Sequence, residues 1–288
     1  MIKPLPRTIL AIHSAVAYGH VGNSAAVFPL QRLGFEVWPI NTLQFSNHPG
    51  YGDFQGRVFP AAHITELING LCDRGVLGQC DAILSGYLGD PGTADAVVDA
   101  VERVRNENPG ALYCCDPIMG DRGQLYVRPG LPEFFAGPAL ARADIVTPNH
   151  FEFGLLVGDA PSTLSGAIRA GMNLLRKGPS IVLITSLERE GAPHDSVEML
   201  AITQEAAFLV ATPRLDLSPN GAGDAMAAIF LGRYLMTRNV EIALSDAASA
   251  VFSILQATVT AGTRELQLIT AQDALLAPPR RLAARRIS

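Results

Sequence analysis

The chain has 288 residues, of which 48% are hydrophobic and 17% charged, and its formal net charge is −5. This length and apolar content suffice for one large α/β domain, and the charge excludes a global basic field that would attract nucleic acid. No long apolar segment opens the chain and no apolar run approaches the ~20 residues of a membrane span, so we expect a cytoplasmic protein without a signal or membrane anchor.

The four cysteines, Cys72, Cys80, Cys114 and Cys115, form no CxxC pair and have no histidine spacing typical of zinc sites. Neighbouring residues of a strand point to opposite faces, so we expect Cys114 and Cys115 to be small core residues in a reducing compartment. At the other end of the chain, residues 277–288 combine two prolines with four arginines, which favours a solvated, frayed tail over a binding patch.

Short apolar runs typical of buried strands alternate with longer helical patterns. The first strand is expected at residues 8–13 and the first helix at 24–33, with Asn23 as its N-cap and Gly34 as its stop. Pro39 favours an edge position for the strand at 36–40. Further strands are expected at 81–85, 112–115, 144–147 and 181–184, a hairpin at 199–202 and 207–210, and helices at 63–71, 93–106, 163–177, 224–236 and 241–259. This alternation predicts a mostly parallel sheet covered by helices on both faces, in a single domain spanning residues 1–288.

Ligands of such sheets bind beyond the carboxyl ends of the strands, so polar residues at these ends are candidates for a site. The residues in that position are Ser14, Asn41, Ser85, Asp116, Thr147, Thr185 and, further along, Asp224.

The segment from Asn220 to Asp224 reads NGAGD and is followed at once by an apolar helical run. Two glycines permit a tight turn that exposes successive N–H groups, and a helix N-terminus adds the positive end of its dipole. Such a turn can hold negative charge on a transferring phosphoryl group while Asp224 accepts a proton from an attacking hydroxyl. On its own, however, GxGD more often marks an aspartate that caps a helix.

Two further segments have both a structural and a catalytic interpretation. Asp116 opens a turn-rich loop, which fits either an Asp-Pro turn or a mobile loop over a site. Asn149 and Glu152 have the spacing of a capping box, and Glu152 could alternatively hold Mg²⁺ through water. The hydroxyls at Thr185 and Ser186 could contact phosphate or a monovalent cation, or cap the next turn.

Several common nucleotide and metal motifs are missing. The glycine loop at residues 19–24 lacks GxGxxG spacing, and the chain contains no Gly-Lys-Ser/Thr of a P-loop and no protein-kinase signature. The early histidines, His13, His20, His48 and His63, have no metal-binding spacing, so structural or substrate-contacting roles are expected for them.

Taken together, these segments resemble pyridoxal kinases of the ribokinase-like superfamily, from about Ile9 to Asp273. GxGD and the NxxE of residues 149–152 mark only the superfamily, whereas QFSNH at 44–48 and GYLG at 86–89 are more specific to pyridoxal kinases. The matching segments, which occur in the family's order, are Ser14, 19–26, 41–48, 85–89, 115–121, 147–152, 184–186 and 221–224. The implied fold is a three-layer sandwich with a mostly parallel central sheet.

The resemblance implies transfer of the γ-phosphate of ATP to the 5′-hydroxymethyl group of pyridoxal, in vitamin B6 salvage. Asp224 matches the catalytic aspartate, and Gly221, Ala222 and Gly223 match the anion hole. The substrate-side matches are Ser14, Val21, His48, Pro49, Gly50 and Tyr87. Asp116, Thr147, Glu152 and Thr185 match positions around ATP, Mg²⁺ and an activating K⁺, and the segment at Thr212, Pro213, Arg214 and Leu215 matches the adenine-side loop. Residues 117–128 match a loop that closes over ATP, and a homodimer is implied.

Two departures from the family pattern stand out. Pro49 and Gly50 follow His48, whereas many relatives have a threonine directly after this histidine. The segment between Val210 and Asn220 is also shorter than in several relatives. The alternatives are a ribokinase-fold kinase for hydroxymethylpyrimidine or another ring alcohol, and a non-catalytic B6-vitamer binding protein. A sugar kinase would need an extra β-lid, for which the segment between Ser14 and Trp38 has no room.

Overall fold

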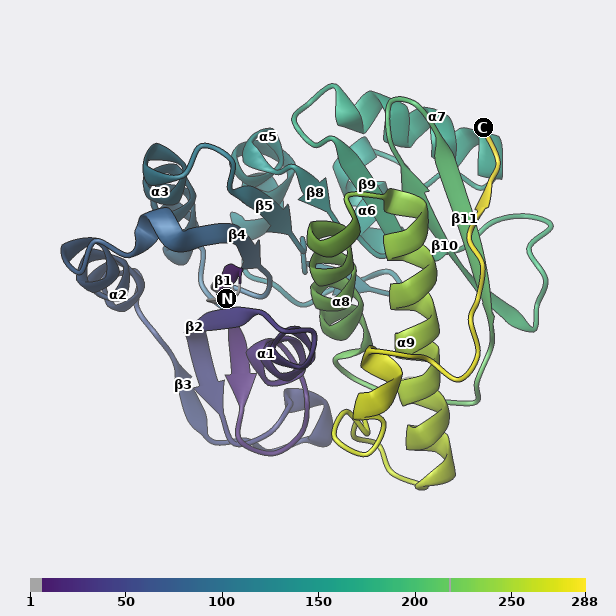
Figure 1. Cartoon of the computed structure of the whole chain (residues 1–288), viewed down its shortest axis with the longest axis horizontal. Helices are drawn as coiled ribbons and strands as arrows, with labels where there is room; N and C mark the ends of the chain where they lie inside the picture. Colours follow the sequence, from purple (N-terminus) through teal and green to yellow (C-terminus); the bar gives the residue numbers. More distant parts are fainter. Residues whose placement is uncertain (1–6, 218) are drawn as a thin grey trace, which may run out of the picture.

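The computed structural model describes residues 7–217 and 219–288. Ten of the described strands form one sheet in the order β12-β11-β10-β9-β8-β5-β4-β1-β2-β3 (Figure 1). The strands are β1 (Thr8–Val16), β2 (Glu36–Phe45), β3 (Gly56–Val58), β4 (Cys80–Ser85), β5 (Leu112–Cys115), β8 (Ile145–Val146), β9 (Ile181–Leu187), β10 (Ser196–Ile202), β11 (Ala207–Pro213) and β12 (Arg285–Arg286). Pairing is parallel from β2 to β9 and antiparallel toward both edges of the sheet. The predicted hairpin forms β10 and β11 near one edge, and β3 forms the other edge.

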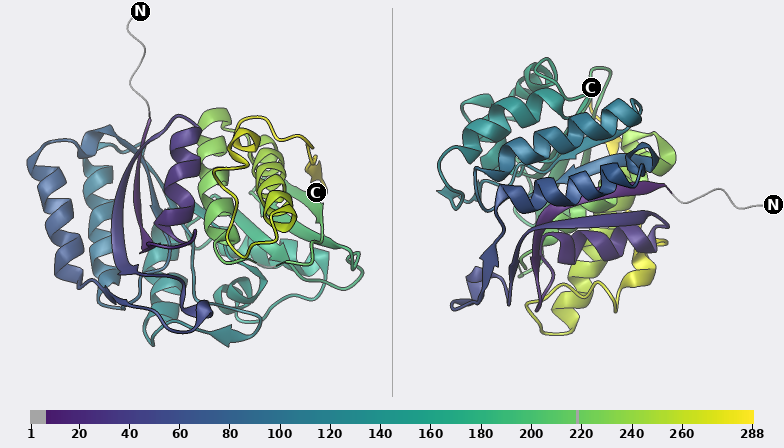
Figure 2. Two further views of the ribbon diagram at one scale, coloured as in Figure 1. Left: turned by 90° about the horizontal axis from the view of Figure 1, so that it is seen from below. Right: turned by 90° about the vertical axis from the view of Figure 1, so that its left-hand side faces the viewer.

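Helices cover both faces of the sheet, which confirms the predicted three-layer architecture. In Figure 2, α2 and α3 lie on one side of the first strands and α1 on the other. One face packs against α1 (Asn23–Arg32), α8 (Ala222–Thr237) and α9 (Val240–Thr260). The opposite face packs against α2 (Ala61–Asp73), α3 (Thr93–Glu107), α4 (Leu131–Phe134), α5 (Leu140–Arg142), α6 (His150–Val157) and α7 (Leu164–Leu175). Between β1 and β2 the described chain forms α1 and no lid strands.

The shorter elements lie in the connections. They are the helical turns η1 (Pro49–Tyr51), η2 (Leu77–Gln79), η3 (Phe135–Ala139) and η4 (Gln272–Leu275), and a two-stranded sheet of β6 (Gly120–Asp121) and β7 (Gln124–Leu125). The strand containing Pro39 was predicted at an edge of the sheet, but β3 lies outside β2. Because β3 pairs only with residues 43–45 of β2, the part of β2 that contains Pro39 still has one unpaired side. Pro39 itself faces Ala11 of β1 and has an open edge on its other side, where its missing N–H is tolerated.

The prediction that Asn23 caps the first helix is wrong. Gly22 occupies the N-cap position, and Asn23 is the first helical residue, only 3% exposed. Its amide instead donates to the carbonyl oxygen of Ile40 at 3.1 Å and to Oδ1 of Asn41 at 2.8 Å. Asn23 therefore ties the start of α1 to β2, a long-range role that its local sequence does not reveal.

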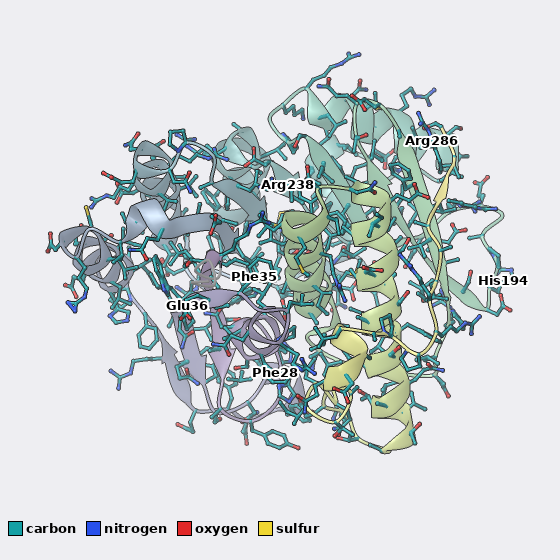
Figure 3. The ribbon with its side chains drawn as sticks, viewed as in Figure 1. Phe28, Phe35, Glu36, His194, Arg238 and Arg286 are labelled. Atoms are coloured by element: carbon teal, nitrogen blue, oxygen red, sulfur yellow. The ribbon has the colours of Figure 1, made fainter. Side chains whose placement is uncertain are left out.

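The C-terminal segment is ordered rather than frayed, which corrects the expectation for residues 277–288. β12 pairs antiparallel with β11, and Arg286 lies on this outer edge (Figure 3). Leu282 and Ala284 are buried, and their backbone N–H groups donate to Oγ of Ser249 and Ser245 at 2.8 and 2.9 Å. Alternate apolar residues thus anchor the segment on α9 despite its arginines.

Helix α9 corrects the statement that no apolar run approaches a membrane span. Its 21 residues are long and apolar enough to cross a bilayer by length and composition, alone among the described helices. In the fold, 67% of its most apolar window is buried inside the protein, as in the core helix of a globular domain.

Candidate active site

A single cleft of about 1260 Å³ lies where the parallel strands end and α8 begins. It brings together the residues that the family resemblance assigns to the site, although these come from segments spread over more than 200 positions, whereas the strand-end candidates Asn41 and Ser85 do not line it. The predicted residues lining it are Ser14, Val21, His48, Pro49, Gly50, Tyr87, Asp116, Thr147, Glu152, Thr185, Thr212, Pro213, Arg214, Leu215, Gly221, Ala222, Gly223 and Asp224. Their roles remain predictions, but their convergence on one cleft is a property of the fold.

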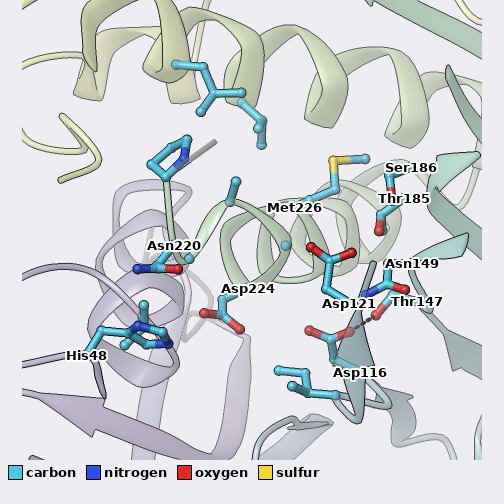
Figure 4. A pocket seen from close by; sticks show the side chains of 18 of the residues that line it. His48, Asp116, Asp121, Thr147, Asn149, Thr185, Ser186, Asn220, Asp224 and Met226 are labelled. Atoms are coloured by element: carbon cyan, nitrogen blue, oxygen red, sulfur yellow. Dashed lines mark hydrogen bonds between the residues drawn. The ribbon is translucent and has the colours of Figure 1, made fainter. Parts of the chain in front are cut away.

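Asp224 lies between two chemically different ends of the cleft (Figure 4). His48 and Asn220 lie on one side of its carboxylate. Asp116, Thr147, Asn149 and Thr185 lie on the other. A carboxylate between a ring-sized pocket and a group of oxygen donors is suitably placed to act between two substrates.

The Asp224 carboxylate is held at both oxygens. Oδ2 accepts a hydrogen bond from the Gly22 backbone N–H at 2.7 Å, and Oδ1 lies 3.2 Å from Nε2 of His13. Burial raises the pKa of this carboxyl, but His13 and the Gly22 N–H outweigh it and hold the pKa below its usual value. The group is therefore ionised at neutral pH and able to accept a proton.

The turn preceding Asp224 presents backbone N–H groups to the cleft. Gly221 is the N-cap of α8 with φ 85°, and a Cβ at this position would collide with the carbonyl oxygen of His20, so only glycine fits. Ala225 is the first N–H to make an intrahelical bond, to the oxygen of Gly221. The N–H groups of Ala222 and Gly223 precede it, at the positive end of a 16-residue helix. Asp224 is thus the third residue of the helix and not its cap.

The ring-sized end of the cleft is formed by Ser14 and Val21, which are nearly buried, and by half-buried Tyr87 and His48. Burial lowers the pKa of His48, against the opposing influence of Asp224 and Glu265. Its Nδ1 accepts from the N–H of Gly50 at 3.0 Å, so the neutral ring presents an N–H at Nε2. This end combines an aromatic ring, apolar surface and single hydrogen-bonding groups, as a small flat ligand requires.

Asp116 is a buried acid at the other end, with 5% exposure. Oδ1 accepts from the Thr147 hydroxyl at 2.9 Å. Burial, then the neighbouring charges of Glu152 and Asp224, raise its pKa well above the usual value. A buried carboxylate repelled by other acids is stabilised by a cation, and the carboxylate and hydroxyl oxygens here are the donors that Mg²⁺ prefers.

Glu152 forms the predicted capping box of α6. Its Oε2 accepts from the Asn149 N–H at 2.9 Å, while Asn149 Oδ1 accepts from the Glu152 N–H at 2.9 Å. Oε1 accepts from the N–H of Met119 at 3.0 Å. Burial raises the pKa of Glu152 to about 7 although these N–H groups lower it. Since both oxygens already accept backbone bonds, Glu152 fits a cation held through water better than direct ligation.

The loop predicted to close over ATP forms the small hairpin of β6 and β7, and its residues Asp121, Arg122 and Tyr126 line the cleft. At the far end, Arg214 is tied to the loop before β10. Its guanidinium donates to the carbonyl oxygens of His194 and Ser196 at 3.1 and 3.0 Å.

Sequence reasoning missed several lining residues. Met226, Val251 and Leu255 add apolar surface to the cleft. Asn149, treated as a cap alone, also donates to the carbonyl oxygen of Gly120 at 2.8 Å. The most consequential contact that the sequence did not reveal is that of His13 with Asp224, because its only sequence signal is a polar residue within an apolar strand.

The chain is similar to known proteins in both sequence and structure. The family model described as phosphomethylpyrimidine kinase matches residues 62–268. A pyridoxal kinase PdxY from Rubrobacter xylanophilus is 54% identical over 97% of each chain. The chain belongs to the pyridoxal kinase family. A second pyridoxal kinase PdxY, from Deinococcus radiodurans, is 53% identical over 98% of this chain and 97% of the relative. The structure of a Leishmania donovani pyridoxal kinase in complex with ADP and pyridoxine superimposes with a TM-score of 0.91 at 28% identity, over 98% of this chain and 99% of that one.

Proposed function

We propose that this enzyme transfers the γ-phosphate of ATP to the 5′-hydroxymethyl group of pyridoxal, giving pyridoxal 5′-phosphate and ADP. The observation that carries the proposal is the position of Asp224, an ionised carboxylate at the N-terminus of α8 between a ring-sized pocket and a group of oxygen donors. Pyridoxal kinases more than 50% identical over nearly the whole chain support the substrate assignment.

In this mechanism Asp224 accepts the proton of the 5′-hydroxyl as its oxygen attacks the γ-phosphorus and the bond to the β-phosphate oxygen breaks. The N–H groups of Gly221, Ala222 and Gly223 stabilise the negative charge on the transferring group. On the acceptor side, Ser14 and Tyr87 hold the pyridine ring, with Val21 and His48 beside it, and Pro49 and Gly50 border this end. On the nucleotide side, residues 212–215 contact the adenine end.

Mg²⁺ is expected near Asp116, Thr147, Glu152 and Thr185, where it would neutralise phosphate charge. K⁺ is expected as an activator at the same end. The test is turnover in chloride salts of K⁺ and of a bulky organic cation, with and without Mg²⁺. Loss of activity without Mg²⁺ and a higher rate in K⁺ are expected, and equal rates in both salts would exclude the monovalent site.

Hydroxymethylpyrimidine is the second candidate acceptor, because the matching family model bears the phosphomethylpyrimidine kinase description. A non-catalytic role in binding B6 vitamers is less consistent with the site, since binding alone requires neither a buried carboxylate nor a phosphate-sized turn beside it.

We also propose a cytoplasmic homodimer that acts on small molecules and not on nucleic acid or membranes. Light scattering coupled to size exclusion tests the oligomeric state, and a mass of about twice 30.6 kDa is expected. A monomer at all concentrations would exclude the dimer.

The direct test of the reaction is to incubate the protein with ATP, Mg²⁺ and pyridoxal and to identify the product by mass and phosphorus NMR. A phosphomonoester on the 5′ carbon is expected. Hydrolysis of ATP without a phosphorylated vitamer would refute the proposal.

A further inference from the structure

His13 is a buried histidine at an irregular point of β1. It is 2% exposed, and the pairing of β1 with β2 shifts register between His13 and Ala15. From this irregularity the side chain reaches Asp224, placing Nε2 3.2 Å from Oδ1. The ring thus joins the start of the chain to the first turn of α8.

The hydrogen bonds at Nδ1 determine which nitrogen of His13 carries the proton. Nδ1 lies 2.8 Å from the backbone nitrogen of Ser14 and 3.2 Å from that of Tyr87, and both N–H groups donate to it. Because Nδ1 is an acceptor, the proton of the neutral ring is on Nε2. Nε2 is buried and has no well-aligned hydrogen-bond partner among the described residues, and its 3.2 Å contact with Oδ1 of Asp224 directs this N–H toward the carboxylate.

The backbone around the ring leaves it little freedom. Gly86 packs directly against the imidazole edge, and a Cβ at this position would collide with Nε2, Cδ2 and Cε1 of His13. The ring is therefore fixed by Gly86 on one edge and by two backbone N–H groups at Nδ1.

A metal site is the competing interpretation of the same cluster. Ligand atoms of His13, Asp116 and Asp224 lie within 4.8 Å of one another. A metal at Nε2, however, requires a lone pair there and the proton on Nδ1, where the N–H groups of Ser14 and Tyr87 already point. The neutral ring cannot satisfy both conditions, so this geometry favours a hydrogen-bond donor over a metal ligand.

We propose that His13 is a positioning residue for the reaction proposed above: its Nε2–H fixes Oδ1 of Asp224 while the Gly22 N–H fixes Oδ2. This arrangement sets the orientation of the carboxylate toward the acceptor hydroxyl. The same imidazole binds the backbone of Ser14 and Tyr87, the two residues predicted to hold the pyridine ring. One side chain therefore aligns the base with the pocket for its substrate.

A matched pair of variants tests this role. His13→Gln and His13→Met have similar length, but only glutamine can donate to Asp224 while its carbonyl accepts the backbone N–H groups. Hydrogen bonds to charged groups contribute enough to predict a loss of about ten- to a hundredfold in kcat for His13→Met. We expect KM for ATP to remain within twofold, and His13→Gln to recover most of the rate. His63→Met, in α2 and outside the cleft, is the control histidine and should match the wild type.

The effect of His13→Met should disappear in the Asp224→Asn background, because the two residues act as one unit. Equal loss in the methionine and glutamine variants, or a full effect in that background, would overturn the positioning role. Nitrogen-15 NMR of the ring decides the hydrogen bond independently of turnover: a proton on Nε2 whose shift changes in Asp224→Asn is expected, and a proton on Nδ1 would refute it. If the wild type fails to phosphorylate pyridoxal while the NMR result holds, the proposed function fails and the hydrogen bond stands.

Discussion

Replacing Asp224 by asparagine isolates its role as proton acceptor. The amide has nearly the same size and keeps one acceptor oxygen, but it cannot take the proton of the attacking hydroxyl. Loss of a general base typically costs about 10²–10⁴-fold in rate, which corresponds to about 2.7–5.4 kcal/mol in activation free energy. We therefore expect kcat to fall by this factor while KM for ATP changes little.

The structure also predicts a cost in stability for Asp224→Asn. The carboxylate faces two N–H groups, one from Gly22 and one from His13, and an amide can accept from only one of them. One buried donor is left opposite the new NH₂ group, which costs about 1–3 kcal/mol of unfolding free energy. Steady-state kinetics with each substrate varied, together with urea denaturation, measures both effects. A kcat within threefold of the wild type would refute the assignment of the base.

Three further predictions concern the ring pocket, pH and the thiols. Tyr87→Ala should raise KM for pyridoxal severalfold to tenfold and leave KM for ATP and the melting temperature nearly unchanged. Ser14→Ala should act in the same direction more weakly. A change confined to the melting temperature would place the pocket elsewhere. Burial raises the pKa of Asp224, but His13 and the Gly22 N–H lower it by more, so the pKa in the folded protein lies below the unfolded value of about 3.9. The ionised carboxylate therefore stabilises the fold at pH values above about 3.9, and this stability is lost as the pH falls through the folded pKa. The stability difference between wild type and Asp224→Asn should therefore be constant from pH 5 to 8 and change as pH falls below about 4; a change centred near neutral pH would contradict the lowered pKa. Alkylation of the native protein at pH 7.5 should modify exposed Cys72 alone, because the other three cysteines are buried and burial raises the pKa of Cys80 to about 11. The intact mass shows how many cysteines are modified, and two or more adducts would contradict the burial of the other three.

Much of the fold and site could be predicted because their signals are local. Apolar runs separated by helical patterns predicted the parallel sheet. Polar residues at the ends of the strands predicted that the site lies beyond the carboxyl ends of the strands. Asp116 and Thr185 line the same cleft although β8 separates their strands, because the parallel strands of one sheet end at the same edge.

The remaining features depend on contacts between distant segments. Asn23 has the sequence position of a cap, yet its amide bonds to β2. Arg285 and Arg286 read as a solvated tail, yet the segment pairs with β11. His13 is one polar residue in an apolar strand, and only the approach of α8 reveals its partner.

The central claim is the choice of pyridoxal as phosphate acceptor, and the ratio of kcat/KM for pyridoxal to that for hydroxymethylpyrimidine tests it most directly. Both values should be measured on one preparation, with Asp224→Asn as the blank for contaminating kinases. We predict a ratio well above one for pyridoxal. A ratio below one would contradict the account and assign the cleft to the pyrimidine.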